Sequence, residues 1–305
     1  MKTNGIIAAM GALALTACSS GGEKKAGNGN ERSMPDIGAM IGDAPGRIGV
    51  AVITSEGDTL TVNNDGGYPL MSVFKLHEAL AVAHRLDSLG RGMDSIVAVG
   101  REELNPNTWS PMLEKYREGD LTLPVSELME YALVYSDNNA SNLLFEKIVS
   151  VEETYAFVRG VLGRDDFRLR YTEHEMQLDH ARAYENRSTP LACAALINRV
   201  FTDSLVSEGK QTAIKSWLLA CNTGLDRIGA PLKDEPGVML GHRTGSGYRT
   251  ADGLLVAHND VGFVSLPDGR HYSIAVLVRD TPQTEEEAAR VIARVSKGIY
   301  EWYNP

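Results

Sequence analysis

The pattern of hydrophobic and polar positions predicts strands near both ends of the chain and helices between them. Residues 47–62 hold two strand-like runs that flank Glu56-Gly57-Asp58, a combination typical of a β-hairpin. From residue 72 to about residue 228, hydrophobic positions recur mostly at helical spacing. The clearest segments predict helices over residues 74–89, 125–135, 139–149, 190–201 and 211–220.

Strand-like segments return after this helical region and are followed by one last helix. The predicted strands cover residues 238–243, 254–266 and 272–278, with Pro267-Asp268-Gly269 as the turn between the last two. Thr284 and Glu287 form a capping box for the final helix. Its hydrophobic residues repeat at helical spacing, so one face is expected to pack against a flat surface; they are Ala288, Val291, Ile292, Val295, Ile299 and Trp302.

This order predicts an α/β fold of the α+β type, in which both chain ends build one antiparallel sheet flanked by helices. Residues 36–70 and 230–305 would form the α/β lobe, and residues 71–229 would form an inserted all-helical lobe. A cleft between two such lobes is where a ligand site is expected. Residues 36–305 are thus expected to form one two-lobed catalytic domain.

Charge and hydropathy exclude two classes of function. The 305 residues carry a net charge of −10, and an acidic chain is a poor candidate for binding nucleic acid, which requires a basic face. The sequence has no apolar run of 18 residues, so no transmembrane helix is predicted.

The N-terminal segment has the features of an export signal. Residues 1–17 combine Lys2 with a short apolar stretch over residues 5–15. They lead to Leu15-Thr16-Ala17-Cys18, which resembles the lipobox of bacterial lipoproteins and predicts lipidation of Cys18; an ordinary signal peptide is the alternative. Residues 18–35 are expected to form a flexible tether.

The other two cysteines, Cys193 and Cys221, lie in helical-looking segments. In an exported protein they could form a disulfide. Two buried, unpaired thiols are at least as plausible from the sequence, so both alternatives stay open.

Two short motifs in the helical region contain candidate catalytic residues. Ser72 and Lys75 are three residues apart on one helix face, where a lysine of lowered pKa could deprotonate the serine. Such a spacing occurs about once by chance in a chain of this length. Ser136-Asp137-Asn138 lies between two predicted helices, and its structural alternative is a turn with a helix N-cap.

A third motif, Arg243-Thr244-Gly245, ends a predicted strand and is followed by Ser246. A cation and a hydroxyl, beside a glycine that permits close approach to the backbone, suit an anionic group of a substrate. Alone, the motif is simply a turn that ends a strand. Glu173 lies in a polar stretch without clear periodicity, and only the other motifs make it a candidate.

Taken together and in this order, the motifs resemble those of the class A serine β-lactamases. The resemblance covers essentially the whole chain after the signal segment. It implies that Ser72 is the nucleophile that opens the lactam ring, and that Lys75 takes part in proton transfer from it. It further implies that Ser136 relays a proton to the leaving nitrogen, and that Glu173 activates the hydrolytic water. The backbone N–H groups of Ser72 and Ser246 would form the oxyanion hole.

The same resemblance implies a set of substrate-binding residues. Asn138 would hydrogen-bond the side-chain amide of the substrate. Arg243, Thr244 and Arg227 would hold its carboxylate. Trp109 matches a position where the family often has an aromatic wall at the mouth of the cleft, although a core tryptophan is the alternative.

Several positions depart from the family pattern. Glu175 also fits the Glu motif, but Pro190 lies 17 residues beyond Glu173, which favours Glu173.

Arg243 replaces the usual lysine, with a different donor geometry. Gln177 replaces an asparagine that helps to hold the hydrolytic water. Tyr171 and Asn186 replace an Arg–Asp pair that clamps the loop around the glutamate, so this loop must be held in another way. These departures resemble the subclass A2 branch, whose members are often cephalosporinases.

The leading functional hypothesis is therefore an exported, lipid-anchored monomer in the envelope of a Gram-negative bacterium. It would hydrolyse β-lactam antibiotics, cephalosporins and penicillins among them, and so confer resistance. One alternative is a penicillin-binding DD-peptidase or transpeptidase, and another is a non-enzymatic β-lactam-sensing lipoprotein. No cofactor is expected, and the seven histidines show no zinc-binding motif.

Overall fold

The computed structural model describes residues 33–64 and 67–305. The predicted signal segment 1–17, Cys18 and almost all of the predicted tether lie outside the described residues. Residues Pro35–Pro305 form one compact unit.

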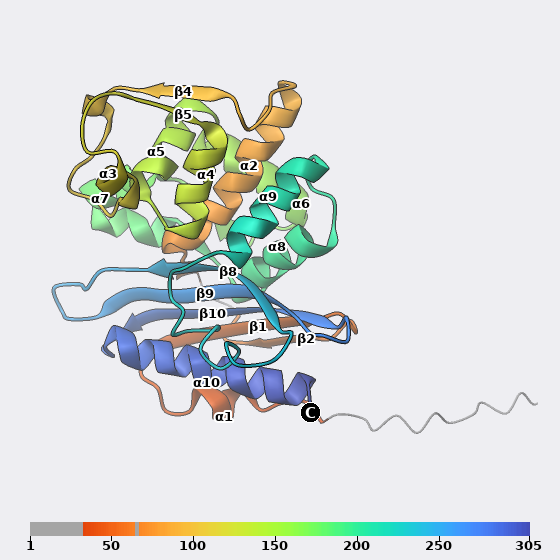
Figure 1. Ribbon diagram of the computed structural model, residues 1–305. Helices are drawn as coiled ribbons and strands as arrows, with labels where there is room; N and C mark the ends of the chain where they lie inside the picture. The colour runs from red at the N-terminus through yellow and green to blue at the C-terminus, as the bar shows by residue number, and fades with distance from the viewer. Residues whose placement is uncertain (1–32, 65–66) are drawn as a thin grey trace, which may run out of the picture. The chain divides into compact units, whose positions relative to one another are not determined.

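A five-stranded antiparallel sheet is the centre of this unit, with strand order β2-β1-β10-β9-β8 (Figure 1). The strands are β1 (Arg47–Thr54), β2 (Thr59–Val62), β8 (Met239–Ser246), β9 (Leu255–Ser265) and β10 (His271–Thr281). In the register, Arg47 lies opposite Arg279, and Val50 opposite both Val276 and Val62. The predicted antiparallel sheet built from both chain ends is confirmed.

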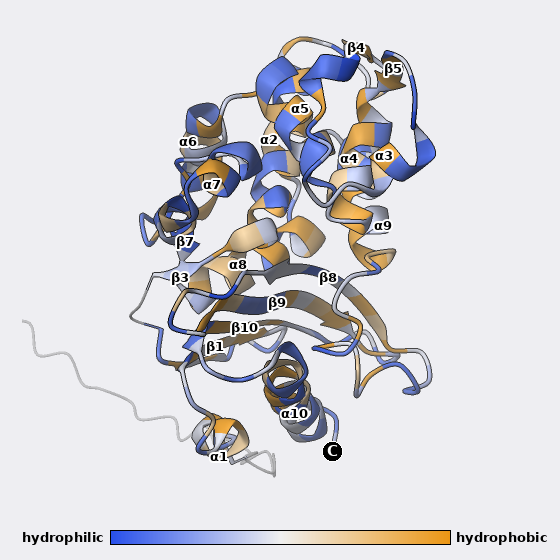
Figure 2. Ribbon diagram, turned by 90° about the vertical axis from the view of Figure 1, so that its left-hand side faces the viewer, coloured by the Kyte–Doolittle hydropathy of each residue, from blue (hydrophilic) through white to orange (hydrophobic). Residues whose placement is uncertain are grey.

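Helices cover both faces of the sheet. On one face lies α10 (Glu285–Tyr303), with α1 (Ile37–Ile41) beside it (Figures 1 and 2). The capping box of Thr284 and Glu287 begins α10 as predicted, and its apolar side packs into a cluster with strand residues such as Val50 and Ile274. On the other face, α8 (Pro190–Thr202) contacts β1, β9 and β10. The central strands β1, β9 and β10 are mostly buried on both sides because both faces are covered.

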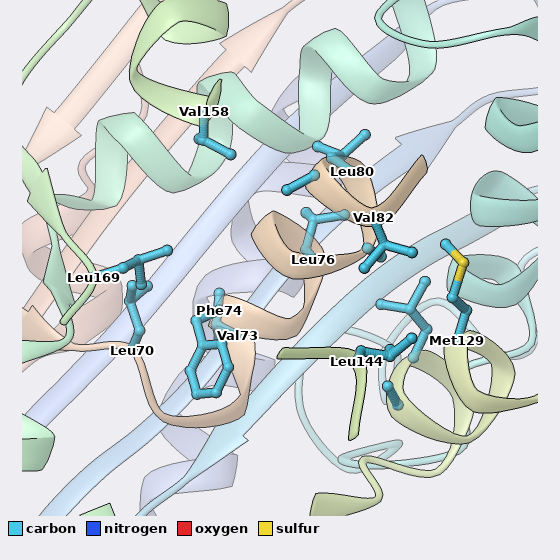
Figure 3. Close-up of a cluster of buried hydrophobic side chains, with 14 of the residues drawn as sticks. Leu70, Val73, Phe74, Leu76, Leu80, Val82, Met129, Leu144, Val158 and Leu169 are labelled. Atoms are coloured by element: carbon cyan, nitrogen blue, oxygen red, sulfur yellow. The ribbon is translucent and has the colours of Figure 1, made fainter. Parts of the chain in front are cut away.

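The remaining helices pack around α2 (Lys75–Ser88), which is almost completely buried. Those that contact it are α4 (Val125–Val134), α5 (Asn138–Lys147), α6 (Val151–Leu162) and α9 (Glu208–Leu219). The shorter helices are α3 (Pro111–Lys115) and α7 (Glu173–Leu178), and α7 contacts α5. Figure 3 shows the hydrophobic core around α2, where Leu76, Leu80 and Val82 lie among side chains from neighbouring elements. This core holds the first turn of α2, and therefore Lys75, in a fixed position.

Two small sheets lie within or directly beside the region expected to be all-helical. One pairs β4 (Ile96–Val99) with β5 (Leu121–Pro124); the other joins β3 (Tyr68–Pro69), β7 (Arg187–Ser188) and β6 (Phe167–Arg168). These strands have two to four residues, too few for a period-two pattern to be recognised. The second small sheet ties the segment before α2 to the segment that carries Glu173.

Strand β8 lies against a short 3₁₀ helix, η1 (Met71–Phe74), which precedes α2. The contact requires a glycine at position 245, because a Cβ atom there would lie 2.4 Å from the carbonyl oxygen of Leu70. The end of β8 is thus held against the segment that carries Ser72. Within the described residues, no helix has the length and apolar character needed to cross a membrane.

Candidate active site

Ser72 and Lys75 lie at the junction of η1 and α2. Lys75 is completely buried, and its Nζ donates hydrogen bonds to Ser72 Oγ at 3.2 Å, the Ser136 carbonyl at 2.9 Å and Asn138 Oδ1 at 2.6 Å. Burial lowers the pKa of Lys75, and the guanidinium of Arg243 acts in the same direction, while Glu173 opposes them. An amine of lowered pKa beside a serine hydroxyl is the arrangement that activates a serine nucleophile.

Glu173 begins α7 and points at the same serine. Its Oε1 accepts a hydrogen bond from Ser72 Oγ at 2.8 Å and lies 3.0 Å from Lys75 Nζ. Glu175 instead closes the capping box of α7 with Thr172, whose backbone N–H donates to Glu175 Oε2 at 2.8 Å. Of these two glutamates, only Glu173 contacts the serine.

The Ser136-Asp137-Asn138 segment also has the helix-capping role considered as its structural alternative. Asp137 is the N-cap of α5, and its buried carboxylate accepts hydrogen bonds from Ala140 N, Met112 N and Ser110 Oγ. Ser136 has a φ of 61°, a strained conformation for a residue other than glycine. The cap holds Ser136 and Asn138 on either side of the Lys75 amine.

Arg243 and Thr244 reach the site from β8. The Arg243 side chain is fully buried, and its Nη2 donates to Ser136 Oγ at 2.7 Å. The hydroxyl of Thr244 lies 2.5 Å from that of Thr223, which follows α9. A buried guanidinium thus stands next to the proposed proton relay.

Arg227 and Ser246 form a second cationic position at the end of β8. Arg227 is 5% exposed, and its Nη2 donates to Ser246 Oγ at 2.6 Å. Its Nη1 donates to the Asn259 carbonyl at 2.7 Å, which fixes the guanidinium against the sheet.

A pocket of 230 Å³ opens beside these groups. Its lining includes Asn138 and Glu173, and the other lining residues are Met71, Asn107, Thr108, Trp109, Met176, Gln177, His180 and Tyr248. Trp109 is 60% exposed and donates from Nε1 to the Tyr135 carbonyl at 2.9 Å. It is therefore a wall of the pocket and not a core tryptophan.

Asn186 holds the loop that carries Glu173. Its buried amide accepts hydrogen bonds from the backbone N–H groups of Arg170 and Tyr171, at 2.8 and 3.1 Å, and donates to the Tyr171 carbonyl at 2.7 Å. Arg182 also lies over the Tyr171 ring, 4.9 Å from its centroid. Hydrogen bonds from one amide to the backbone thus occupy the place of the expected Arg–Asp pair.

Gln177 bridges this loop to the opposite side of the pocket. Its Nε2 donates to the Asn107 carbonyl at 2.7 Å, and its Oε1 accepts from Asn105 Nδ2 at 2.9 Å. Both ends of the amide are engaged, so the side chain closes the wall of the pocket between α7 and residues 105–107.

A buried glutamate next to the site, Glu78, was not predicted from the sequence. Glu78 is fully buried one turn after Lys75, and Ser141 Oγ donates to its Oε2 at 2.8 Å. Burial raises the pKa of Glu78 well above its ordinary value. The signal for Glu78 in the sequence is a charged residue among the apolar positions of α2. Among residues 33–64 and 67–305, no three His, Cys, Asp or Glu side chains are grouped as a metal ion would require.

Comparison with known proteins agrees with this geometry. The model of the family described as "Beta-lactamase enzyme family" matches residues 33–303. A solved class A β-lactamase from Bacteroides cellulosilyticus is 33% identical, with a TM-score of 0.83 over 88% of this chain and 95% of that one. The chain belongs to the class A β-lactamases.

Two further relatives show how far the likeness extends. A β-lactamase from Phocaeicola vulgatus is 45% identical to this one over 87% of the present chain and 82% of its own. The TLA-3 extended-spectrum β-lactamase is 31% identical, with a TM-score of 0.85 over 88% of this chain and 97% of that one. The enzyme is therefore a hydrolase that opens the β-lactam ring of antibiotics through a serine acyl-enzyme.

Proposed function

We propose that Ser72 is the acylated serine of this β-lactamase and that Glu173 drives hydrolysis of the acyl-enzyme. The proposal is supported by one geometric observation, the position of Glu173 Oε1 at 2.8 Å from Ser72 Oγ and 3.0 Å from Lys75 Nζ. A carboxylate in hydrogen-bond reach of a serine can also reach a water molecule bound beside that serine.

In acylation, Ser72 Oγ attacks the lactam carbonyl while Lys75 or Glu173 accepts its proton. The backbone N–H groups of Ser72 and Ser246 stabilise the oxyanion, a kind of interaction that is worth about 3 kcal/mol. Ser136 passes a proton to the departing nitrogen, and Arg243, at 2.7 Å, orients its hydroxyl. Acylation is complete when the carbon–nitrogen bond of the ring has broken.

In deacylation, Glu173 takes a proton from a water molecule that attacks the ester carbonyl, and Ser72 leaves as the free hydroxyl. Asn138 binds the amide of the substrate side chain. Arg227, Arg243 and Thr244 bind the substrate carboxylate, with Gly245 allowing close approach and Trp109 covering the mouth of the pocket.

Exchange of Glu173 for Gln tests this assignment. A glutamine cannot accept the proton of the water, so Ser72 should still be acylated while turnover falls by about 100-fold or more. Intact mass spectrometry should find the acyl-enzyme accumulating on Ser72, and Ser72→Ala should neither acylate nor turn over.

Glu175→Gln is the matched control for the Glu173 exchange. It weakens only the cap of α7, so it should retain most of the turnover at some expense of stability. Turnover at the full rate by Glu173→Gln, without a trapped adduct, would exclude Glu173 as the residue that activates the water.

The proposed substrates are cephalosporins and penicillins. This rests on the likeness of Tyr171, Gln177 and Asn186 to the subclass A2 pattern. Hydrolysis rates of a penicillin, a cephalosporin and a carbapenem, measured side by side, test it. A higher kcat/KM for the carbapenem than for the other two would contradict the proposal.

We further propose that the enzyme acts as an exported monomer anchored in the cell envelope through lipid on Cys18. The support is the Leu15-Thr16-Ala17-Cys18 sequence after a short apolar segment. Wild-type activity should sediment with membranes of the producing cells, and Cys18→Ser activity should not. Equal sedimentation of the two proteins would contradict the anchor.

A further inference from the structure

A buried thiol lies behind β8, on the side away from the substrate pocket. Cys221 follows α9 and is 4% exposed, with its Sγ 3.4 Å from Thr223 Oγ1. His242, from β8, lines the same pocket as Cys221 and interacts electrostatically with its thiol, and His242 Nδ1 lies 3.0 Å from Asp260 Oδ1 on β9. A thiol, an imidazole and a carboxylate that holds the imidazole thus occur together behind β8.

The charges around Cys221 favour its thiolate. Burial alone would raise the pKa of the thiol, but His242 and the guanidinium of Arg243 outweigh it and lower the pKa to about 6. Burial alone would lower the pKa of His242, but Asp260 and Cys221 outweigh it and raise the pKa of the imidazole well above its usual range. Cys193 provides the contrast, since burial raises the pKa of its thiol to about 12. Both cysteines are free, and Cys221 is the one whose surroundings favour the thiolate, the reactive form of the group.

A pocket of 310 Å³ leads to this thiol. Cys221 and His242 form part of its lining, together with apolar side chains that include Leu225, Leu232 and Leu240. The volume lies at the lower end of the range for small-molecule sites. None of its lining residues lines the pocket that contains Glu173, so a molecule can enter it without competing directly with substrate.

The thiol is connected to the substrate-binding residues through two contacts. The Thr223 hydroxyl, 3.4 Å from Cys221 Sγ, is also 2.5 Å from the hydroxyl of Thr244. The guanidinium of Arg243 interacts electrostatically with Cys221, and its buried Nε has no hydrogen-bond partner within the described part of the chain. Loss of the thiolate charge would therefore leave the buried Arg243 without a nearby anion on this side.

We propose that Cys221 is a covalent modification site for small apolar electrophiles and thiol-exchange reagents that enter this pocket, and that its modification inhibits the enzyme through Arg243 and Thr244. The expected inhibition rests on the substrate-binding roles proposed above for Arg243 and Thr244.

The chemistry is simplest for methyl methanethiosulfonate, which is both small and uncharged. The Cys221 thiolate attacks the sulfenyl sulfur, a new S–S bond forms, and the bond from that sulfur to the sulfonyl group breaks. Methanesulfinate leaves with the electron pair and no proton is required. Cys221 is oxidised to a mixed disulfide as the reagent is reduced, and dithiothreitol reverses the step.

The test uses the full chain with Cys18→Ser, so that Cys193 and Cys221 are the remaining thiols. After treatment with the thiosulfonate at neutral pH, intact mass and peptide mapping should find one methylthio group, on Cys221. The kcat/KM for a chromogenic cephalosporin should fall by about tenfold, within the range usual for coupling between two sites. Dithiothreitol should restore it.

Three variants complete the experiment. Cys221→Ser should take up no group and lose its response to the reagent, whatever its starting rate. In His242→Gln, Cys221 should react with the thiosulfonate more slowly, because the neutral glutamine cannot stabilise the thiolate charge. Ser72→Ala should be modified at the wild-type rate although it has no activity, so a wrong Ser72 assignment would not affect this readout. Modification of Cys193 instead, or a Cys221 adduct with unchanged kcat/KM, would overturn the proposal.

Discussion

At the scale of single residues, the site depends on charges that are buried together. The site contains two basic and two acidic side chains that are each at most 8% exposed: Lys75, Arg243, Glu78 and Glu173. Such groups are stable only when each has a partner or becomes neutral. The pKa values of Lys75 and Glu78 therefore each depend on the other three charged groups.

Glu78 provides a prediction for stability against pH. Its pKa is raised in the folded protein by burial, so the folded state keeps a proton that the unfolded chain releases above about pH 4.5. As pH rises above this value, the free energy of unfolding of the wild type should fall relative to that of Glu78→Gln. The fall should be at most about 1.4 kcal/mol per pH unit. Urea unfolding of both proteins at pH 4.5 and pH 7.5 measures the difference. Glu114→Gln, at an exposed position, is the control, and a difference that does not change with pH would contradict a protonated Glu78.

Arg243 gives a second prediction at this scale. Lysine keeps the charge but not the fixed geometry that reaches Ser136 Oγ at 2.7 Å. Arg243→Lys should lower kcat/KM for a cephalosporin by about tenfold, the loss of one charge-assisted hydrogen bond. Steady-state kinetics beside Arg117→Lys, an exposed exchange, provide the comparison; equal values for the two would argue against the role of the guanidinium geometry.

Residue types and spacing identified most of the site, but not the side chains that support it. Ser72, Ser136 and Arg243 each belong to a short motif, and Pro190 selected Glu173 over Glu175. Asn186 and Glu78 have no such motif. Their roles depend on which backbone groups or side chains lie opposite them, and that information exists only in the folded chain.

At the scale of elements, the long periodic segments were predicted within a few residues. Examples are α10, β9 and β10, where burial of one or both faces leaves a clear pattern. The short α7 and the two small sheets were missed, because six residues or fewer hold at most two turns of helix or one paired strand. These elements are stabilised by tertiary contacts, such as the bonds of Asn186 to residues 170 and 171.

The Asn186 amide yields a prediction for the loop as an element. Asn186→Ala removes three hydrogen bonds to partly buried backbone groups, at a cost of about 0.5–1.5 kcal/mol for each bond. The loop should loosen around Glu173, so deacylation should slow while the burst of acylation persists in stopped-flow traces. Asn186→Asp, which retains the acceptor for residues 170 and 171 but loses the donor, should be intermediate. Unchanged deacylation in the alanine variant would mean that other contacts hold the loop.

The contact between β8 and η1 gives a prediction at the same scale. Gly245→Ala introduces a Cβ 2.4 Å from the Leu70 carbonyl oxygen, so strand and helix must separate. A displacement of that size should reduce kcat/KM by about 100-fold. Gly160→Ala in α6 has open space for its Cβ and should stabilise the enzyme by about 0.5–1 kcal/mol. Wild-type activity of Gly245→Ala would show that β8 can shift without affecting the site.

At the scale of the whole unit, the sheet requires both ends of the chain. β1 lies between β2 and β10, and α10 covers the face opposite α8. Removal of residues 285–305 would uncover the apolar cluster that includes Val276 and Ile274. The shortened chain should lose its cooperative thermal transition, monitored by circular dichroism, whereas removal of Pro305 alone should not. A cooperative transition without α10 would show that the sheet is stable with one face uncovered.

The pairing of Arg47 with Arg279 also has a consequence for the order of events during synthesis. The first long strand to leave the ribosome meets its neighbour only after most of the chain has followed, a delay of about ten seconds or more at usual elongation rates. During that interval β1 has an unpaired apolar edge, which is prone to aggregate. A chaperone that shields this edge until β10 is available, before or after export, should therefore raise the yield of folded enzyme.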